Sequence, residues 1–121
     1  LELAHDVARW KWNTKAPVTD PERERAFLRA MADAGRAHGL TPADTERFFA
    51  AQIEAGKRVQ QADLRAWAAE RRGAFADVPP LPSVTRPEID RVSRAMLPAL
   101  ARLQSERLQL SEPALRQAID R

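Results

Sequence analysis

The sequence predicts an all-α protein, a single-domain helical bundle of about five helices that spans residues 1–121. Three observations support this prediction. Apolar residues recur with the period of a helix in four segments, and the alternation typical of a strand is missing. The length of 121 residues suits one domain with one hydrophobic core. Residues 73–84 contain three prolines and are predicted to form a linker before the fourth helix.

The first two helices are predicted over residues 1–13 and from Thr19 to just before Gly39. The first opens without a capping residue, which indicates a truncated helix. In the second, Thr19 and Glu22 have the spacing of a capping box, and Pro21 suits the first turn. Gly39 is the kind of residue that commonly ends a helix in the left-handed conformation.

The third helix is predicted from Thr41 to about Arg72, and the fourth from Thr85, because each opens with a threonine cap and a nearby proline. Pro98 lies inside the fourth helix and should kink or break it. A short last helix is expected after Ser111. The residues of the fourth helix that are predicted to face inward are Ile89, Val92, Met96, Leu97, Leu100 and Leu103.

Composition narrows the possible chemistry. The chain has no cysteine, which excludes disulfides, thiolate nucleophiles and cysteine-bound metals. No apolar run approaches the roughly 20 residues that a membrane span requires, and no signal peptide is visible at Leu1. His5 and His38 lack apparent partners for a triad or a metal site and are expected at the surface. The net charge of +3 reflects either an arginine-rich proteome or an anionic partner.

Two polar residues lie among apolar residues on predicted helices. Lys11 shares the helix face of Val7 and needs an anion or a polar acceptor, unless its ammonium reaches solvent at the end of the bundle. Gln60 lies between Gly56 and Leu64, and a buried glutamine needs partners for up to about four hydrogen bonds. Those partners belong either to a neighbouring helix or to a ligand.

Charged residues flank the start of the second predicted helix. The negative charge of Asp20 complements the positive end of the helix dipole. The dipole disfavours an arginine at this end, so Arg23 needs another explanation, and an anion site at the helix start provides one. Glu24 lies beside the apolar stripe, and Arg86 repeats the arginine pattern in the fourth helix. Together with Lys11, these side chains predict an interior polar pocket that suits a small dianion with a hydroxyl group.

Three segments together resemble the all-α chorismate mutases, and their spacing is similar to the periplasmic or secreted subclass in particular. These segments are residues 7–12 (VARWKW), 17–24 (PVTDPERE) and 48–60 (FFAAQIEAGKRVQ). The resemblance covers about residues 1–100, and residues 104–121 match weakly. The family has an arginine immediately before the position of Leu1, so the resemblance also implies that the first helix is truncated.

The resemblance implies a pericyclic rearrangement of chorismate to prephenate and two catalytic residues. Lys11 resembles the family's lysine that contacts the ether oxygen and a carboxylate of the substrate. Gln60 is similar to the residue that donates a hydrogen bond to that oxygen from the other side. Gly56 differs from the small hydroxyl-bearing residue of several relatives, so a water or a backbone amide would replace that contact.

The resemblance also implies four substrate-binding residues. Arg23 and Arg86 look like the arginines that bind substrate, and Arg86 is the one that the secreted subclass supplies from a later helix. Glu24 resembles the carboxylate that receives the substrate hydroxyl. Asp20 falls at the edge of the pocket.

The resemblance further implies chorismate as the small-molecule partner, no cofactor and no metal, a homodimer, and a periplasmic or secreted location. No nucleic-acid or membrane partner is expected. Three alternatives stay open: an isochorismate-pyruvate lyase of the same fold, a basic helical module that binds nucleic acid, and an inactive or regulatory paralogue. Scattered arginines disfavour the nucleic-acid module. Retention of the five polar residues Lys11, Arg23, Glu24, Gln60 and Arg86 disfavours the paralogue.

Overall fold

The computed structural model describes the backbone of residues 2–119 and the side chains of residues 2–107. Within that part of the chain, all regular structure is helical. The order is α1 (Glu2–Thr14), α2 (Pro21–Arg36), α3 (Pro42–Ala69), the short π-helical segment η1 (Leu81–Thr85) and α4 (Arg86–Ile119). The all-α prediction is confirmed, with four α-helices described instead of about five. None of the helices in this range is both long and apolar enough to cross a bilayer.

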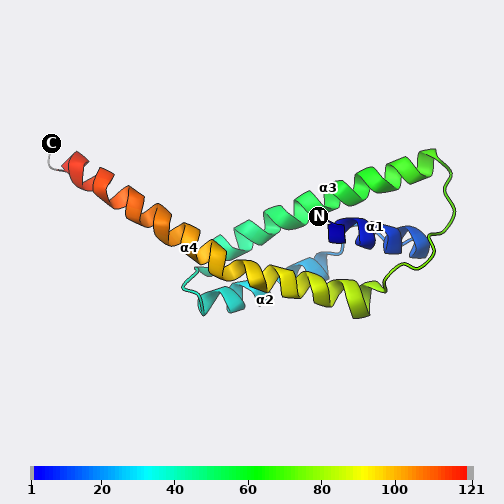
Figure 1. The fold of residues 1–121 in the computed structure, drawn as a ribbon, viewed down its shortest axis with the longest axis horizontal. Helices are drawn as coiled ribbons and strands as arrows, with labels where there is room; N and C mark the ends of the chain where they lie inside the picture. Colours follow the sequence, from blue (N-terminus) through cyan, green and yellow to red (C-terminus); the bar gives the residue numbers. More distant parts are fainter. Residues whose placement is uncertain (1, 120–121) are drawn as a thin grey trace.

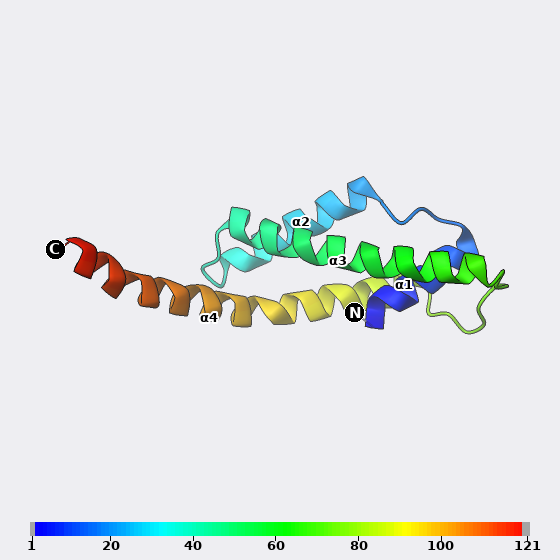
Figure 2. The ribbon, with the colours of Figure 1, turned by 90° about the horizontal axis from the view of Figure 1, so that it is seen from above.

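The long helix α3 is the element on which α1 and α2 both pack (Figure 1). Helix α1 also contacts η1, which leads directly into α4, and α4 then packs against α2. Figure 2 shows α4 as one gently curved helix whose last turns extend beyond the other three. These contacts therefore join all four α-helices into one packed unit.

The main apolar core lies where α2, α3 and α4 meet. Met31, Leu40, Phe49 and Leu97 form its buried cluster. Gly35 of α2 allows the close approach of α3, because a Cβ atom at this position would lie 2.9 Å from the Thr45 Oγ1 atom. The interlocked packing explains why Gly35 and Thr45 are both buried here.

A second, aromatic cluster lies toward the opposite end of α3. The Trp12 and Trp67 rings meet edge to face with centroids 5.9 Å apart, and Trp67 meets Phe75 at 4.6 Å. Asn13 exchanges two hydrogen bonds with the backbone of Phe75, at 3.0 and 2.8 Å. These contacts attach the first residues of the predicted linker to α1, so this end of the linker is part of the packed structure.

The helix starts confirm one predicted cap and correct another. Thr41 caps α3 as predicted, accepting a hydrogen bond from the Asp44 backbone N–H at 3.2 Å. In α2 the cap is Asp20 instead of Thr19, and its carboxylate accepts from the Arg23 N–H at 3.3 Å. Aspartate is at least as good an N-cap as threonine, which explains the shift by one residue.

The start of α4 differs from the prediction. Thr85 is buried and belongs to η1 instead of capping a helix, and the Arg86 N–H donates to the carbonyl of Leu81. The chain is therefore already helical when it reaches Arg86, so no side-chain cap is required. The predicted linker is shorter than expected, because its last residues form η1.

The prediction of a separate helix after Ser111 is wrong, and of the kink or break predicted at Pro98 the break is wrong, because α4 runs without interruption through both positions. Pro98 has no backbone N–H, so the carbonyl of Arg94, four residues earlier, lacks its helical donor. Both residues are exposed, so water can bond to that carbonyl instead. Leu97 is buried as predicted, whereas Val92 and Leu103 are 38% and 64% exposed. Ser93 is buried instead, because the helix turns that face toward the other helices.

Candidate active site

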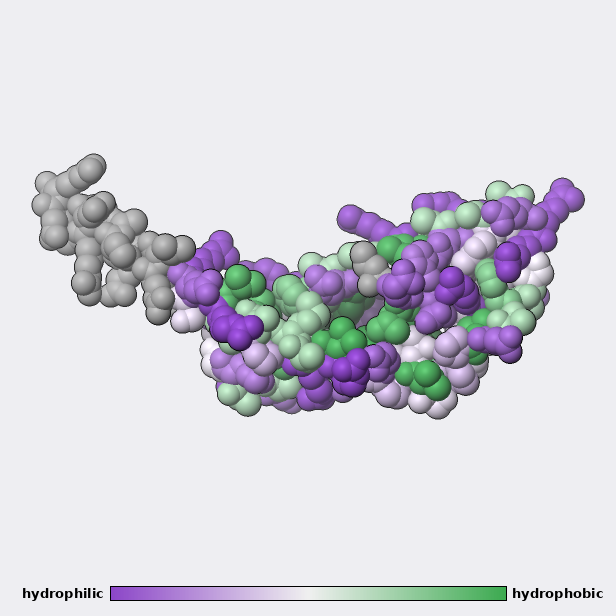
Figure 3. Space-filling model, viewed as in Figure 1, coloured by the Kyte–Doolittle hydropathy of each residue, from purple (hydrophilic) through white to green (hydrophobic). Residues whose placement is uncertain are grey.

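A cavity of about 660 Å³ lies among α1, α2, α3, η1 and α4. Its apolar wall includes Phe27 and Phe49 from the main core and Ile89 and Met96 from α4. Figure 3 shows apolar side chains gathered in the middle of the molecule, over α4 and beside the start of α1. The polar side chains that the sequence singled out all line this cavity: Lys11, Asp20, Arg23, Glu24, Gln60 and Arg86.

Lys11 lies in the last turn of α1 and is half-buried. Its Nζ atom donates a hydrogen bond of 2.6 Å to the carbonyl of Val18. The loop turns back toward it through Lys15, which has the left-handed φ of 59°. Burial and the nearby Arg86 charge lower the pKa of Lys11, whereas the carboxylate of Asp20 opposes this shift. A neutral carbonyl does not neutralise an ammonium, so this charge is available to an anion in the cavity.

The two arginines lie near each other on one side of the cavity. Arg23 is exposed in the first turn of α2, and Arg86 is half-buried at the start of α4. Burial lowers the pKa of Arg86, the positive charge of Arg23 lowers it further, and Asp20 opposes both. Within the described part of the chain, neither guanidinium forms an ion pair with a carboxylate. Two like charges without such partners favour the binding of an anionic group.

Gln60 projects from α3 and is only 8% exposed. Its Oε1 atom is fully buried and has no hydrogen-bond partner among the described residues. Such an orphaned group costs roughly 1–3 kcal/mol in a folded protein. Rotation of the amide exchanges its oxygen and NH₂, so Gln60 can offer a ligand either an acceptor or a donor. One turn earlier, Gly56 leaves open space, because a Cβ there would meet nothing within 4 Å.

Glu24 carries the acidic end of the cavity, and both of its oxygens have partners. Its Oε2 atom accepts a hydrogen bond of 2.9 Å from the Asp20 N–H, and Oε1 lies 2.6 Å from the Lys57 Nζ atom. Burial alone would raise the pKa of Glu24, but these two hydrogen bonds and the charge of Lys11 together lower it. The carboxylate is therefore held in its ionised form.

Lys57 is a cavity residue that the sequence analysis missed. It lies four residues after Ile53 and seven before Leu64, both members of the predicted apolar face of α3. That spacing alone indicates an inward position. The hydrogen bond to Glu24 raises the pKa of Lys57, so it stays a cation. Ser93 and Asp90 of α4 also line the cavity and were not predicted to do so.

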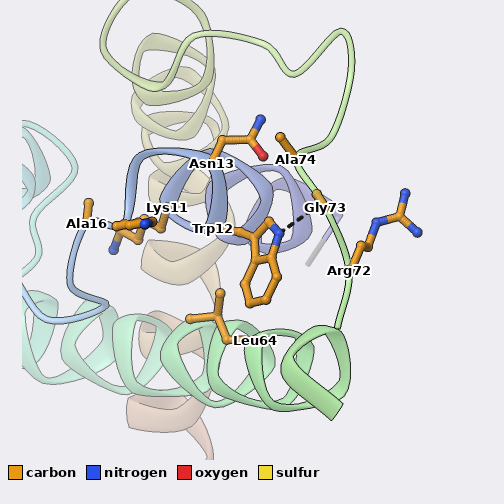
Figure 4. Close-up of a pocket in the computed structure, with 9 residues that line it drawn as sticks. Lys11, Trp12, Asn13, Ala16, Leu64, Arg72, Gly73 and Ala74 are labelled. Atoms are coloured by element: carbon orange, nitrogen blue, oxygen red, sulfur yellow. Dashed lines mark hydrogen bonds between the residues drawn. The ribbon is translucent and has the colours of Figure 1, made fainter. Parts of the chain in front are cut away.

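A second cavity, of about 410 Å³, shares Lys11 with the first (Figure 4). In this view the Trp12 ring points toward Leu64, and its N–H donates to the Gly73 carbonyl at 3.1 Å. Arg72 points away from Trp12. This cavity lies against the linker and brings none of the other predicted site residues together.

His38 is exposed as expected, and the His5 side chain is 37% exposed but has a carboxylate partner that the sequence did not indicate. The Nδ1 atom of His5 lies 2.5 Å from the Asp63 Oδ2 atom on α3, and the pair is partly buried. The partners are 58 positions apart, so no local pattern indicated the contact. It joins α1 to α3 outside the main cavity.

The helical bundle encloses a cavity whose lining includes several cationic side chains and a buried amide, an arrangement that suits a small anion. Its lining includes the cations Lys11, Arg23 and Arg86, the ion-paired Lys57, the amide of Gln60 and the carboxylates of Asp20, Glu24 and Asp90, among mostly apolar residues. The chain belongs to the chorismate mutase type II family, whose sequence model matches residues 1–61. The predicted family is confirmed.

Individual relatives agree with this assignment. The chain is 28% identical over 102 residues to a secreted chorismate mutase of Mycolicibacterium smegmatis, covering 84% of this chain and 56% of the relative. It is 28% identical over 121 residues to a secreted chorismate mutase of Mycobacterium tuberculosis, covering 100% of this chain and 59% of the relative.

A solved structure shares the fold. The crystal structure of chorismate mutase from Burkholderia thailandensis is 40% identical in sequence and superposes with a TM-score of 0.78. The match covers 84% of this chain and 63% of that one. This chain therefore spans less than two thirds of the length of the relatives that it matches.

Proposed function

We propose that this chain catalyses the rearrangement of chorismate to prephenate. The reaction is an isomerisation in which a C–O bond breaks while a C–C bond forms, so no atom is gained or lost. Membership of the chorismate mutase type II family supports this function. The observation that carries it is the cavity, where cations from three helices have no carboxylate partner, and the buried Oε1 atom of Gln60 no hydrogen-bond partner, among the described residues.

The proposed mechanism assigns each polar side chain a task. Arg23 and Arg86 hold the carboxylates of the substrate and so fix the compact conformer in which the two reacting carbons approach. Lys11 and Gln60 stabilise the negative charge that grows on the ether oxygen as its bond to carbon breaks. Glu24, kept ionised, accepts a hydrogen bond from the ring hydroxyl. Asp20 orders the start of α2 and thereby the positions of Arg23 and Glu24.

The test is to follow the loss of chorismate by its ultraviolet absorbance with purified protein, and to repeat the assay with isochorismate. We expect rapid loss of chorismate and little reaction of isochorismate. Release of pyruvate from isochorismate with stable chorismate would instead indicate the lyase. Salt-sensitive binding of duplex DNA without either reaction would favour the nucleic-acid module.

We also propose that residues 1–121 form one functional domain, that the protein is a homodimer, and that it acts in the periplasm or outside the cell. The location is supported by the relatives that are named as secreted. Sedimentation equilibrium tests the dimer, and cell fractionation tests the location. A monomer, or a protein found in the cytoplasmic fraction, would contradict these two proposals.

A further inference from the structure

The ion pair between Glu24 of α2 and Lys57 of α3 has a role beyond stabilising the fold. We propose that Lys57 is a positioning residue that holds the Glu24 carboxylate in place as the acceptor for the substrate's hydroxyl group. This inference rests on the proposed function and adds a residue that the sequence analysis did not include. Lys57 acts through Glu24, so its loss should change how the site works without removing a contact to the reacting oxygen.

Both oxygens of the Glu24 carboxylate have a donor. Lys57 Nζ lies 2.6 Å from one oxygen of Glu24, and the Asp20 N–H donates to the other at 2.9 Å. Two donors from different segments, one on each oxygen, restrain the rotation of the carboxylate plane. Each oxygen keeps a lone pair for a ligand, because an ionised carboxylate can accept about four hydrogen bonds.

Lys57 is itself mostly buried. Its side chain is 13% exposed, and a second ion pair joins its Nζ to Glu54 at 3.3 Å. Glu54 is 64% exposed, so that contact is well solvated and worth little. The Glu24 side chain is 24% exposed, and both members of the inner pair line the cavity. An ordinary surface ion pair would not be expected to line the same cavity as Lys11 and Gln60.

The charge balance around Glu24 depends on Lys57. Burial works against the ionised carboxylate, and the hydrogen bonds from Lys57 and from the Asp20 N–H outweigh it. Lys11 of α1 adds a smaller favourable charge. Removing Lys57 leaves the burial and one backbone donor, so the pKa of Glu24 should rise. Activity that needs ionised Glu24 is present above the pKa of Glu24. A variant without Lys57 should therefore begin to lose activity on acidification at a higher pH than the wild type.

The experiment compares Lys57→Met with Arg58→Met, a control that removes an exposed charge from the neighbouring position. Carbon-13 NMR follows the titration of the Glu24 carboxyl without substrate, with its signal identified from Glu24→Gln. The pH profile of kcat/KM for chorismate is then measured for each variant. Lys57→Arg restores the charge, and Lys57→Gln replaces Lys57→Met if the latter folds poorly.

We expect Lys57→Met to raise the pKa of Glu24 and to move the acid limb of the pH profile to higher pH. In mild acid, kcat/KM should fall by about tenfold, which is the effect of losing one charge-assisted hydrogen bond. Arg58→Met should match the wild type, and Lys57→Arg should recover most of the change. An unchanged Glu24 titration, or parallel profiles in an active enzyme, would overturn the inference alone. An inactive wild type would overturn the proposed function, while the NMR titration would still report on the pair.

Discussion

Replacing Gln60 with leucine should stabilise the protein and inactivate it. The amide is 8% exposed, and its Oε1 atom is buried without a partner among the described residues. An unsatisfied buried group costs roughly 1–3 kcal/mol, and leucine fills a similar volume without that penalty. We therefore expect the free energy of unfolding to rise by about 1 kcal/mol or more in Gln60→Leu. For a chain of this size, about 1 kcal/mol corresponds to roughly 4 °C in Tm.

The same change removes a donor that the proposed mechanism places against the ether oxygen. Loss of one such preorganised donor typically lowers kcat by about 10²–10³-fold. Urea unfolding followed by circular dichroism measures the first effect, and the decay of chorismate absorbance measures the second. Both are compared with the wild type at the same pH and ionic strength.

The two effects have opposite signs, which separates this account from its alternative. If Gln60 were a structural amide bonded to a neighbouring helix, Gln60→Leu would lose stability, because that partner would be left unsatisfied. A less stable variant that keeps its turnover would refute the reasoning, and Gln60 would then belong to the scaffold.

Three further predictions follow from the same cavity. Lys11→Ala should remove roughly 3–4 kcal/mol of transition-state stabilisation without unfolding the protein; unchanged turnover in a folded variant contradicts it. Arg23→Ala and Arg86→Ala should each raise KM and lower kcat together, because the same clamps bind and orient the substrate; wild-type kinetics in Arg86→Ala would mean that another arginine serves this role. Gln60→Glu should be active in mild acid and lose activity toward neutral pH, because a glutamate donates a hydrogen bond only when it is protonated. Burial and the substrate's carboxylates should raise the pKa of this glutamate by more than the charge of Lys11 lowers it. Profiles of kcat/KM against pH that run parallel for Gln60→Glu and the wild type would exclude a contact with the reacting oxygen.

The helical class could be predicted from sequence because its signals are local. The spacing of apolar residues defined the four main helices, and Thr41 capped α3 as its pattern indicated. The errors at two helix starts came from competition between nearby signals. Asp20 took the cap from Thr19, and η1 made a cap at Thr85 unnecessary.

The polar residues of the cavity were predictable when they broke an apolar pattern. Lys11 and Gln60 stood out in this way, and the structure places both in the cavity wall. Lys57 was missed although its spacing from Ile53 and Leu64 indicates an inward position, because a lysine is usually read as a solvated residue. Its value depends on Glu24, which lies 33 residues earlier in the chain, and only the packing of α2 on α3 brings the two together. The contact between His5 and Asp63 was missed for the same reason.

The measurement that tests the central claim most directly is identification of the product that the purified chain forms from chorismate, by proton NMR of the reaction mixture. The account predicts that chorismate disappears as prephenate accumulates in equal amount, with no pyruvate released, and that the reaction slows strongly in Lys11→Ala. Chorismate that persists unchanged with folded wild-type protein, or prephenate formation that Lys11→Ala leaves untouched, would contradict the assignment of this cavity as the site of the rearrangement.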